Sequence, residues 1–269
     1  MVDPGQVAIL VSSFDGYRDA WDPFFTLFFR YWPDCPFTIY LISNNARYDG
    51  ERVINLALGD DMGWANNMIA ALSRIQAPYV IYLQEDYFLT RPVSTQRIIE
   101  LIEYMDAKQA GYLRLYPSPG PDLDCADNPD IGEISKKAPY RVSMQAAVWR
   151  KDILQSLLVK DEDGWDMEFN GSERSLELDA VFLSVHRNGS VVRDDDLPLP
   201  YLCTAIIRGS WIREALEYCR AEGIELDTSR VTIEPYSRYL IRKFEPIFWK
   251  LRMIRLSFWI RKTLHRLKK

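Results

Sequence analysis

Residues 79–88 read Tyr79-Val80-Ile81-Tyr82-Leu83-Gln84-Glu85-Asp86-Tyr87-Phe88. The apolar run that opens this stretch is typical of a strand buried on both faces of a sheet. Two adjacent carboxylates, Glu85 and Asp86, stand where that strand should end. Ligands of open α/β sheets bind outside the carboxyl ends of the strands, so this acidic end predicts a ligand site.

The two carboxylates repel each other unless a cation or hydrogen-bond donors offset their charge. A divalent ion that bridges a diphosphate would do so, because hard oxygen ligands suit Mg²⁺ and Mn²⁺. The alternative interpretation is a solvated turn that caps the next element.

The residues before this stretch alternate between strand-like and helix-like patterns. Apolar runs at 6–13, 37–42 and 53–58 predict strands, and the stretches 19–31 and 64–75 predict helices. Strands that alternate with helices in this way predict a mostly parallel sheet covered by helices.

The same pattern continues beyond residue 88. The predicted elements are helices near 94–105, 151–159 and 211–222, strands near 111–115, 143–149 and 181–186, and a loop at 117–129. No repeat or low-complexity linker interrupts the pattern. We therefore expect one α/β domain, residues 1–237, and a C-terminal appendage, residues 238–269.

The composition is that of an ordinary globular protein. The 269 residues are 48% hydrophobic and 26% charged, which excludes disordered, collagen-like and coiled-coil classes. The four cysteines form no CxxC pair, so we expect reduced thiols rather than a zinc site or a disulfide scaffold. No secretory signal and no run of about 18 apolar residues is evident, so we expect a cytoplasmic protein without a spanning helix.

The charge is divided unevenly along the chain. Residues 238–269 contain 11 Lys and Arg and one acid, Glu245, which gives +10. The remaining residues carry 22 bases and 37 acids, which gives −15. An acidic body with a basic tail predicts that the tail meets an anionic partner.

The tail is also amphipathic. Its apolar residues form two helical stripes, Ile247, Leu251, Ile254 and Phe258, and Trp249, Met253, Leu256 and Ile260. Interfacial helices combine such stripes with basic residues, whereas nucleic-acid-binding arms are usually basic without them. We therefore expect peripheral association with the inner face of the cytoplasmic membrane and no nucleic-acid partner. Packing of one stripe on the domain is the alternative.

Several segments resemble one family. They are 11–17 (VSSFDGY), 21–25 (WDPFF), 32–36 (WPDCP), 63–64 (GW) and 79–88. Over about residues 6–240, the chain resembles bacterial glycosyltransferases of the GT-A type, which assemble lipopolysaccharide and capsule polysaccharide. The resemblance implies a Rossmann-like, mostly parallel sheet and a hexosyltransferase-like enzyme. It would move a sugar from a UDP-linked donor to a saccharide or lipid-linked acceptor, with inversion.

In that family an Asp-x-Asp motif holds the donor diphosphate through a metal. Here the triplet reads Gln84-Glu85-Asp86, so the first Asp is missing and strict metal dependence is open. The resemblance implies that Glu85 and Asp86 contact the donor and that Asp86 holds Mn²⁺ or Mg²⁺. His186 is a further candidate for metal or phosphate, although a lone histidine is more often structural.

The resemblance also places the nucleotide against the ends of the first two strands and the start of the next helix. The residues implied are Ser12, Ser13, Phe14, Asp15, Asn44, Asn45, Trp64 and Asn67. Asn44 and Asn45 are equally well explained as turn residues, because Asn tolerates left-handed backbone.

A sugar transfer with inversion needs a carboxylate that takes the proton of the acceptor hydroxyl. The segment Gly164-Trp165-Asp166-Met167-Glu168-Phe169 resembles the acidic base motif of these transferases. Glu168 is the first candidate for the base and Asp166 the second. A helix start enriched in acid is the alternative interpretation.

Other classes fit less well. A Rossmann dehydrogenase, a P-loop enzyme and an α/β-hydrolase would need GxGxxG, GxxxxGK[ST] or GxSxG, none of which occurs. A nucleotidyltransferase would carry a Gly-rich loop with Arg and Lys after the first strand, where this chain has residues 12–17. A catalytically decayed, nucleotide-binding protein that acts as a membrane-associated scaffold remains the alternative function.

Overall fold

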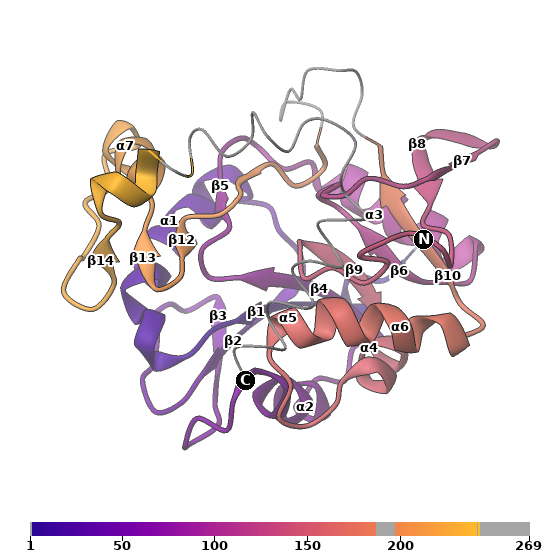
Figure 1. The fold of residues 1–269 in the computed structure, drawn as a ribbon, viewed down its shortest axis with the longest axis horizontal. Helices are drawn as coiled ribbons and strands as arrows, with labels where there is room; N and C mark the ends of the chain where they lie inside the picture. The colour runs from indigo at the N-terminus through magenta and orange to yellow at the C-terminus, as the bar shows by residue number, and fades with distance from the viewer. Residues whose placement is uncertain (1, 187–196, 241, 243–269) are drawn as a thin grey trace.

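The computed structural model describes residues 2–186, 197–240 and 242. Its centre is a nine-stranded sheet of order β3-β2-β1-β4-β9-β6-β10-β8-β7 (Figure 1). The strands are β1 Val7–Ser12, β2 Thr38–Ser43, β3 Val53–Ala57, β4 Tyr79–Gln84, β6 Ala110–Arg114, β7 Leu123–Cys125, β8 Asn128–Glu133, β9 Ala147–Arg150 and β10 Val181–Val185.

Most of this sheet is parallel. β3, β2, β1 and β4 run in one direction, and Ser12 of β1 lies opposite Gln84 of β4. Only β9 and β8 run against the other seven strands of this sheet. The predicted α/β class, a mostly parallel sheet flanked by helices, is therefore confirmed.

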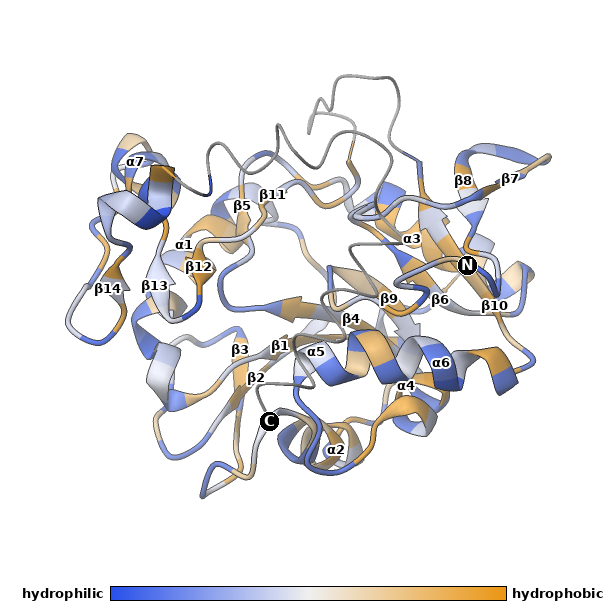
Figure 2. Cartoon of the chain, viewed as in Figure 1, coloured by the Kyte–Doolittle hydropathy of each residue, from blue (hydrophilic) through white to orange (hydrophobic). Residues whose placement is uncertain are grey.

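Helices cover both faces of the sheet. They are α1 Trp21–Tyr31, α2 Trp64–Arg74, α3 Thr95–Ala107, α4 Lys151–Leu157, α5 Gly164–Asp166, α6 Ser172–Arg174 and α7 Arg213–Ala221. Alternate residues of a strand point to opposite faces. Val7, Ile9 and Val11 accordingly join the core with α1, α3 and α7. Ala8 and Leu10 join a second core with α2 and α4. In Figure 2 apolar colour accordingly marks much of β4, and α2 shows both colours.

The region between β6 and β9 differs from the sequence prediction. The expected loop at 117–129 contains β7 and the start of β8, and the expected strand at 143–149 begins only at Ala147. β8 has no strand-like alternation because it is rich in Asn, Pro, Asp and Gly. Pairing with β10, which places Leu183 opposite Glu133, gives it a strand conformation that its own residues do not favour.

The segment after residue 197 returns to the acidic end of β4. β11 (Tyr201–Leu202) pairs with β5 (Phe88–Leu89), directly after that end. A small sheet follows, made of β12 (Ile206–Ile207), β13 (Ser210–Trp211) and β14 (Thr232–Ile233). Residues distant in sequence are thereby brought beside Glu85 and Asp86.

Most of the basic appendage lies outside the described residues. Its first part is held by Arg242, which forms ion pairs with Glu214 of α7 and, at 2.8 Å, with the buried Glu234. Arg213 lies over the rings of Tyr236 and Tyr239, at 5.2 and 6.0 Å from their centroids. Among the described residues, no helix has the length and apolarity needed to cross a membrane.

Candidate functional site

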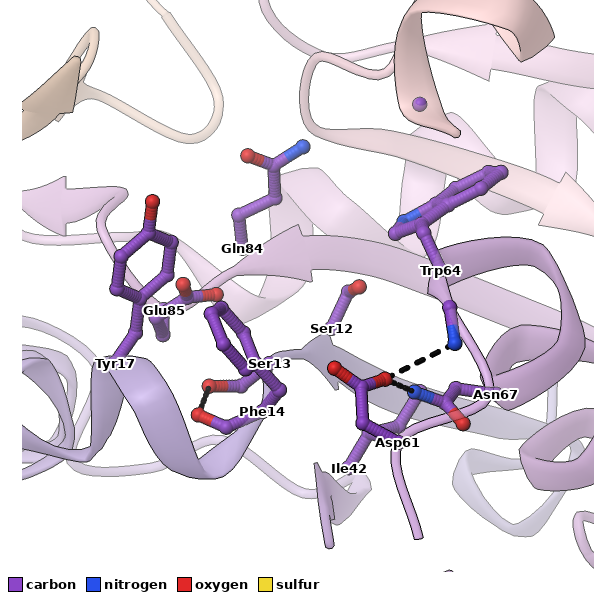
Figure 3. Close-up of a pocket in the computed structure, with 12 residues that line it drawn as sticks. Ser12, Ser13, Phe14, Tyr17, Ile42, Asp61, Trp64, Asn67, Gln84 and Glu85 are labelled. Atoms are coloured by element: carbon purple, nitrogen blue, oxygen red, sulfur yellow. Dashed lines mark hydrogen bonds between the residues drawn. The ribbon is translucent and has the colours of Figure 1, made fainter. Parts of the chain in front are cut away.

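A cavity of about 280 Å³ opens at the carboxyl ends of β1 and β4 (Figure 3). Its lining residues are Ser12, Ser13, Phe14, Tyr17, Ile42, Asp61, Gly63, Trp64, Asn67, Gln84, Glu85 and Gly164. In the order β3-β2-β1-β4, the chain adds β2 and β3 on one side of β1 and then crosses over to add β4 on the other side. The cavity therefore lies at the switch point where open α/β sheets bind ligands.

Aromatic rings form two walls of this cavity. Phe14 and Tyr17 lie on one side, with ring centroids 4.7 Å apart and an interplanar angle of 62°, and Trp64 lies on the other (Figure 3). Trp64 is brought there by Gly63, whose φ of +86° turns the chain into α2 at little cost only for glycine. Between these walls a flat ring could be covered on its faces.

Of the adjacent pair Glu85 and Asp86, Glu85 is the one that lines the cavity. Its side chain is only 6% exposed, and burial, followed by the charge of Asp86, raises its pKa well above the ordinary value. Burial, Glu85 and Asp86 likewise raise the pKa of Tyr17. A cation at this wall would relieve the repulsion that disfavours the charged form of Glu85.

Asp86, the expected main contact, points elsewhere. Its Oδ2 accepts hydrogen bonds from the Thr204 hydroxyl and, at 3.1 Å, from the backbone N–H of Ile206. Burial raises the pKa of Asp86 to about 6, although these two donors lower it. Glu85 lines the cavity and Asp86 does not, and the contact of either with a donor stays a prediction.

Asp15, Asn44 and Asn45 join two strand ends instead of lining the cavity. The Asp15 carboxylate accepts backbone N–H bonds from Asn44 at 2.8 Å, Asn45 at 3.0 Å and Ala46 at 2.9 Å. Asn44 Oδ1 accepts the backbone N–H of Asp15 at 3.0 Å. Although burial raises it, these backbone donors hold the pKa of Asp15 below its ordinary value. We call this set of bonds the Asp15 clip.

The other predicted nucleotide contacts do lie together. Ser12, Ser13, Phe14, Trp64 and Asn67 all line the cavity. Ser12, Trp64 and Gln84 also place hydrogen-bonding groups at the buried Tyr82 hydroxyl, whose pKa is raised mainly by burial. Their contact with a nucleotide remains a prediction.

Glu168 lies one helical turn after the cavity-lining Gly164. Its Oε1 accepts hydrogen bonds from the Ser143 hydroxyl at 3.0 Å and the Met144 backbone N–H at 2.8 Å. It stands in a π-helical turn, Met167–Gly171, a conformation frequent at functional sites. Two donors thus orient this carboxylate, and Glu168 itself is not among the residues that line the cavity.

Asp166 has a structural task in the same segment. With Asp163 it forms a reciprocal capping box at the start of α5, with bonds of 2.9 and 3.2 Å. It is also buried. This engagement favours Glu168 over Asp166 as the candidate base.

His186 lies at the end of β10, and its Nε2 is 3.5 Å from Asp124 of β7. Two strands separate β10 from β4, so these two strands lie about 14 Å apart at ordinary strand spacing, and His186 does not line the cavity. No group of three or more His, Cys, Asp or Glu within the described ranges could hold a metal ion. The further acidic run Asp194-Asp195-Asp196 lies outside the described residues.

Sequence reasoning missed several lining residues. They are Tyr17, Ile42, Asp61, Gly63 and Gly164. Asp61 and Gly63 had a usable signal, because they follow the third strand at the same carboxyl edge of the sheet. Tyr17 had none, since its approach to the cavity depends on the short helix Asp15–Ala20.

No family model and no curated protein matches the chain. Solved structures with a similar fold include S. aureus TarS, residues 1–349, with a TM-score of 0.47 and 12% identity over 95% of this chain and 78% of that one. The same protein in complex with UDP-GlcNAc gives 0.43 and 11% over the same shares. A cytidylyltransferase from Leptospira borgpetersenii gives 0.46 and 12% over 90% of this chain and 96% of that one. At 11–12% identity these likenesses concern the fold alone.

Proposed function

We propose that this protein is a glycosyltransferase that takes a sugar from a nucleotide-sugar donor, UDP-linked, and transfers it with inversion. The arrangement of the cavity supports this function. The cavity at the ends of β1 and β4 joins aromatic walls with a desolvated carboxylate at Glu85, and Gly164, four residues before the oriented carboxylate of Glu168, also lines it. The aromatic walls suit a nucleobase. Glu85 suits the cation and the departing diphosphate, and Glu168 suits the acceptor hydroxyl.

The charge of the lining supports a divalent cation as cofactor. Asp61 and Glu85 are acidic, and none of the twelve lining residues is Lys or Arg. A diphosphate would be repelled here without a cation. Mg²⁺ and Mn²⁺ need only one or two protein carboxylates beside phosphate oxygens and water, which fits Glu85. When bound, such an ion would neutralise charge on the departing diphosphate.

The residues of the chain then have separate tasks. Glu168, held by Ser143 and Met144, takes the proton from the acceptor hydroxyl. The acceptor oxygen forms its bond to the anomeric carbon while the bond to the diphosphate breaks on the opposite face, which inverts the configuration. Phe14 and Trp64 hold the nucleoside, so that the sugar is presented to Glu168.

The acceptor we propose is a saccharide or lipid-linked saccharide of cell-surface polysaccharide synthesis, either lipopolysaccharide or capsule. The basic, apolar-rich segment 238–269 supports a place on the inner membrane face, where such acceptors are anchored. A decayed transferase acting as a scaffold would keep the nucleotide cavity but not need the orientation of Glu168.

Binding and turnover separate these possibilities. We expect UDP with Mn²⁺ to raise the melting temperature, because a ligand of the native state must stabilise it. Hydrolysis of a UDP-sugar to free sugar, or transfer of the sugar to an added acceptor, would show that the protein is an enzyme and not a scaffold. Failure of the protein to bind any nucleoside diphosphate at millimolar concentration, with or without metal, would refute the proposed function.

A further inference from the structure

Asp61 has a carboxylate that is fixed on one side and open on the other. It lies in the loop between β3 and α2. Its Oδ1 accepts hydrogen bonds from the backbone N–H of Gly63 at 3.0 Å and from Asn67 Nδ2 at 2.8 Å. Asn67 is itself only 4% exposed, so this anchor is well packed. Within the described parts of the chain, no hydrogen bond engages Oδ2, which points into the space between Phe14 and Trp64 (Figure 3).

The orientation of Asn67 follows from the same bonds. If the amide were flipped, its oxygen would face the Asp61 carboxylate and two acceptors would repel each other. The donor end of Asn67 is therefore directed at Asp61. Because Gly63 and Asn67 both bind Oδ1, the carboxylate cannot turn without losing two hydrogen bonds.

A carboxylate only accepts hydrogen bonds, and it repels phosphate. It is therefore unsuited to the diphosphate part of a nucleotide and suited to a part that donates. Asp61 stands opposite Phe14, on a different wall from Glu85. The cavity thus offers one carboxylate for the cation and diphosphate and a second for the nucleoside.

We propose that Asp61 Oδ2 accepts a hydrogen bond from the nucleoside of the bound donor, either from the imide N–H of uracil or from a ribose hydroxyl. This inference rests on the proposed function, because it assigns a contact within the same cavity. It makes Asp61 a specificity residue that distinguishes nucleosides by their donors. A site built to accept such a donor discriminates strongly against analogues that lack it.

The test compares Asp61→Asn with wild type and with Asp60→Asn, an exposed neighbour that does not line the cavity. Asparagine keeps an oxygen for Gly63 and Asn67 and presents an NH₂ group to the ligand. We expect the affinity for UDP with Mn²⁺, measured by calorimetry, to fall about tenfold or more in Asp61→Asn, as for loss of a charged hydrogen bond. Asp60→Asn should bind as wild type.

Two analogues identify the donor atom. If the uracil imide donates, N3-methyl-UDP binds wild type about tenfold or more weakly than UDP, and Asp61→Asn no longer distinguishes the two. If a ribose hydroxyl donates, 2′-deoxy-UDP shows that pattern instead. Either result supports the inference, and an unchanged melting temperature of the unliganded variant excludes loss of folding.

The binding measurements distinguish failure of the inference about Asp61 from failure of the proposed function. If wild type binds UDP and Asp61→Asn binds it equally well, the inference about Asp61 is overturned while the nucleotide site stands. If wild type binds none of UDP, CDP, GDP and ADP, the proposed function itself fails. An effect of Asp61→Asn on UDP-sugars but not on UDP would assign Asp61 to the sugar and overturn the nucleoside contact.

Discussion

At the scale of single residues, the adjacent carboxylates Glu85 and Asp86 have separate environments. Glu85 faces the cavity, and Asp86 faces Thr204 and Ile206, which follow it by 118 and 120 positions. The acidic pair itself was predictable from the end of an apolar run. The direction of each side chain was not, because it is set by a segment far along the chain.

Glu85→Gln should stabilise the unliganded protein at pH 7. A carboxyl whose folded pKa is raised contributes stability that is present below its unfolded pKa and is lost as pH rises through the folded pKa. For Asp86 this loss falls between pH 3.8 and about 6. Burial and the charge of Asp86 impose a loss of the same kind on Glu85 as pH rises above its ordinary pKa of 4.5, and glutamine, which does not ionise, should remove that loss and increase the free energy of unfolding at pH 7 by about 1–2 kcal/mol.

Urea unfolding at pH 5 and pH 7 measures this effect, with Glu51→Gln, at an exposed turn residue, as the control. The same Glu85→Gln variant should lose the increase in UDP affinity that Mn²⁺ gives to wild type. A variant less stable than wild type at pH 7 would show that the carboxylate of Glu85 is stabilised in the unliganded fold.

Glu168→Gln should separate donor binding from turnover. Glutamine keeps an oxygen for the Ser143 and Met144 donors but cannot take a proton at neutral pH. We expect UDP affinity near that of wild type and sugar transfer reduced about 10²-fold or more. Asp166→Asn, which alters the capping box, should mainly lower the melting temperature. Full activity in Glu168→Gln with none in Asp166→Asn would reverse our assignment.

At the scale of elements, the parallel half of the sheet could be predicted because apolar runs and helical periodicity agree there. The β7–β8 hairpin could not, since its strands form by pairing with β10. Asp15 illustrates the same limit at the site. Its contact with a nucleotide stays a prediction, whereas its bonds to amides 29 to 31 positions away, which join the β1 end to the β2 end, could not be predicted from the sequence.

Asp15→Ala should loosen that junction. Three backbone N–H groups would lose their acceptor, and we expect a loss of about 1–3 kcal/mol in the free energy of unfolding. Because Ser12, Ser13 and Phe14 directly precede the Asp15 clip, UDP affinity should also fall. Hydrogen exchange should accelerate at the amides of residues 44–46 but not in β10. Asp49→Ala, at an exposed loop position, is the matched control, and equal exchange in both variants would contradict a clip role.

At the scale of the whole molecule, the domain and the basic segment meet at a defined junction. Arg242 is paired with Glu214 and with the buried Glu234, so a chain ending before Arg242 would leave Glu234 without this partner. Beside this junction Tyr236 is 59% exposed and Leu240 is 36% exposed. A truncated chain that tests the basic segment should therefore end after Lys243. It keeps the ion pairs of Arg242 and removes eight Lys and Arg together with the two apolar stripes.

We expect the full chain to sediment with vesicles that contain anionic lipid and the chain ending at Lys243 to stay in the supernatant. Each basic group near an anionic leaflet contributes about 1 kcal/mol, so replacing Lys250, Arg252 and Arg255 by Gln should weaken binding markedly. High salt should release the full chain, because these interactions are screened. If one stripe instead packs on the domain, the truncated chain would show a lower melting temperature. Equal sedimentation of the full and truncated chains, or sedimentation unaffected by salt, would exclude residues 244–269 as an electrostatic membrane anchor.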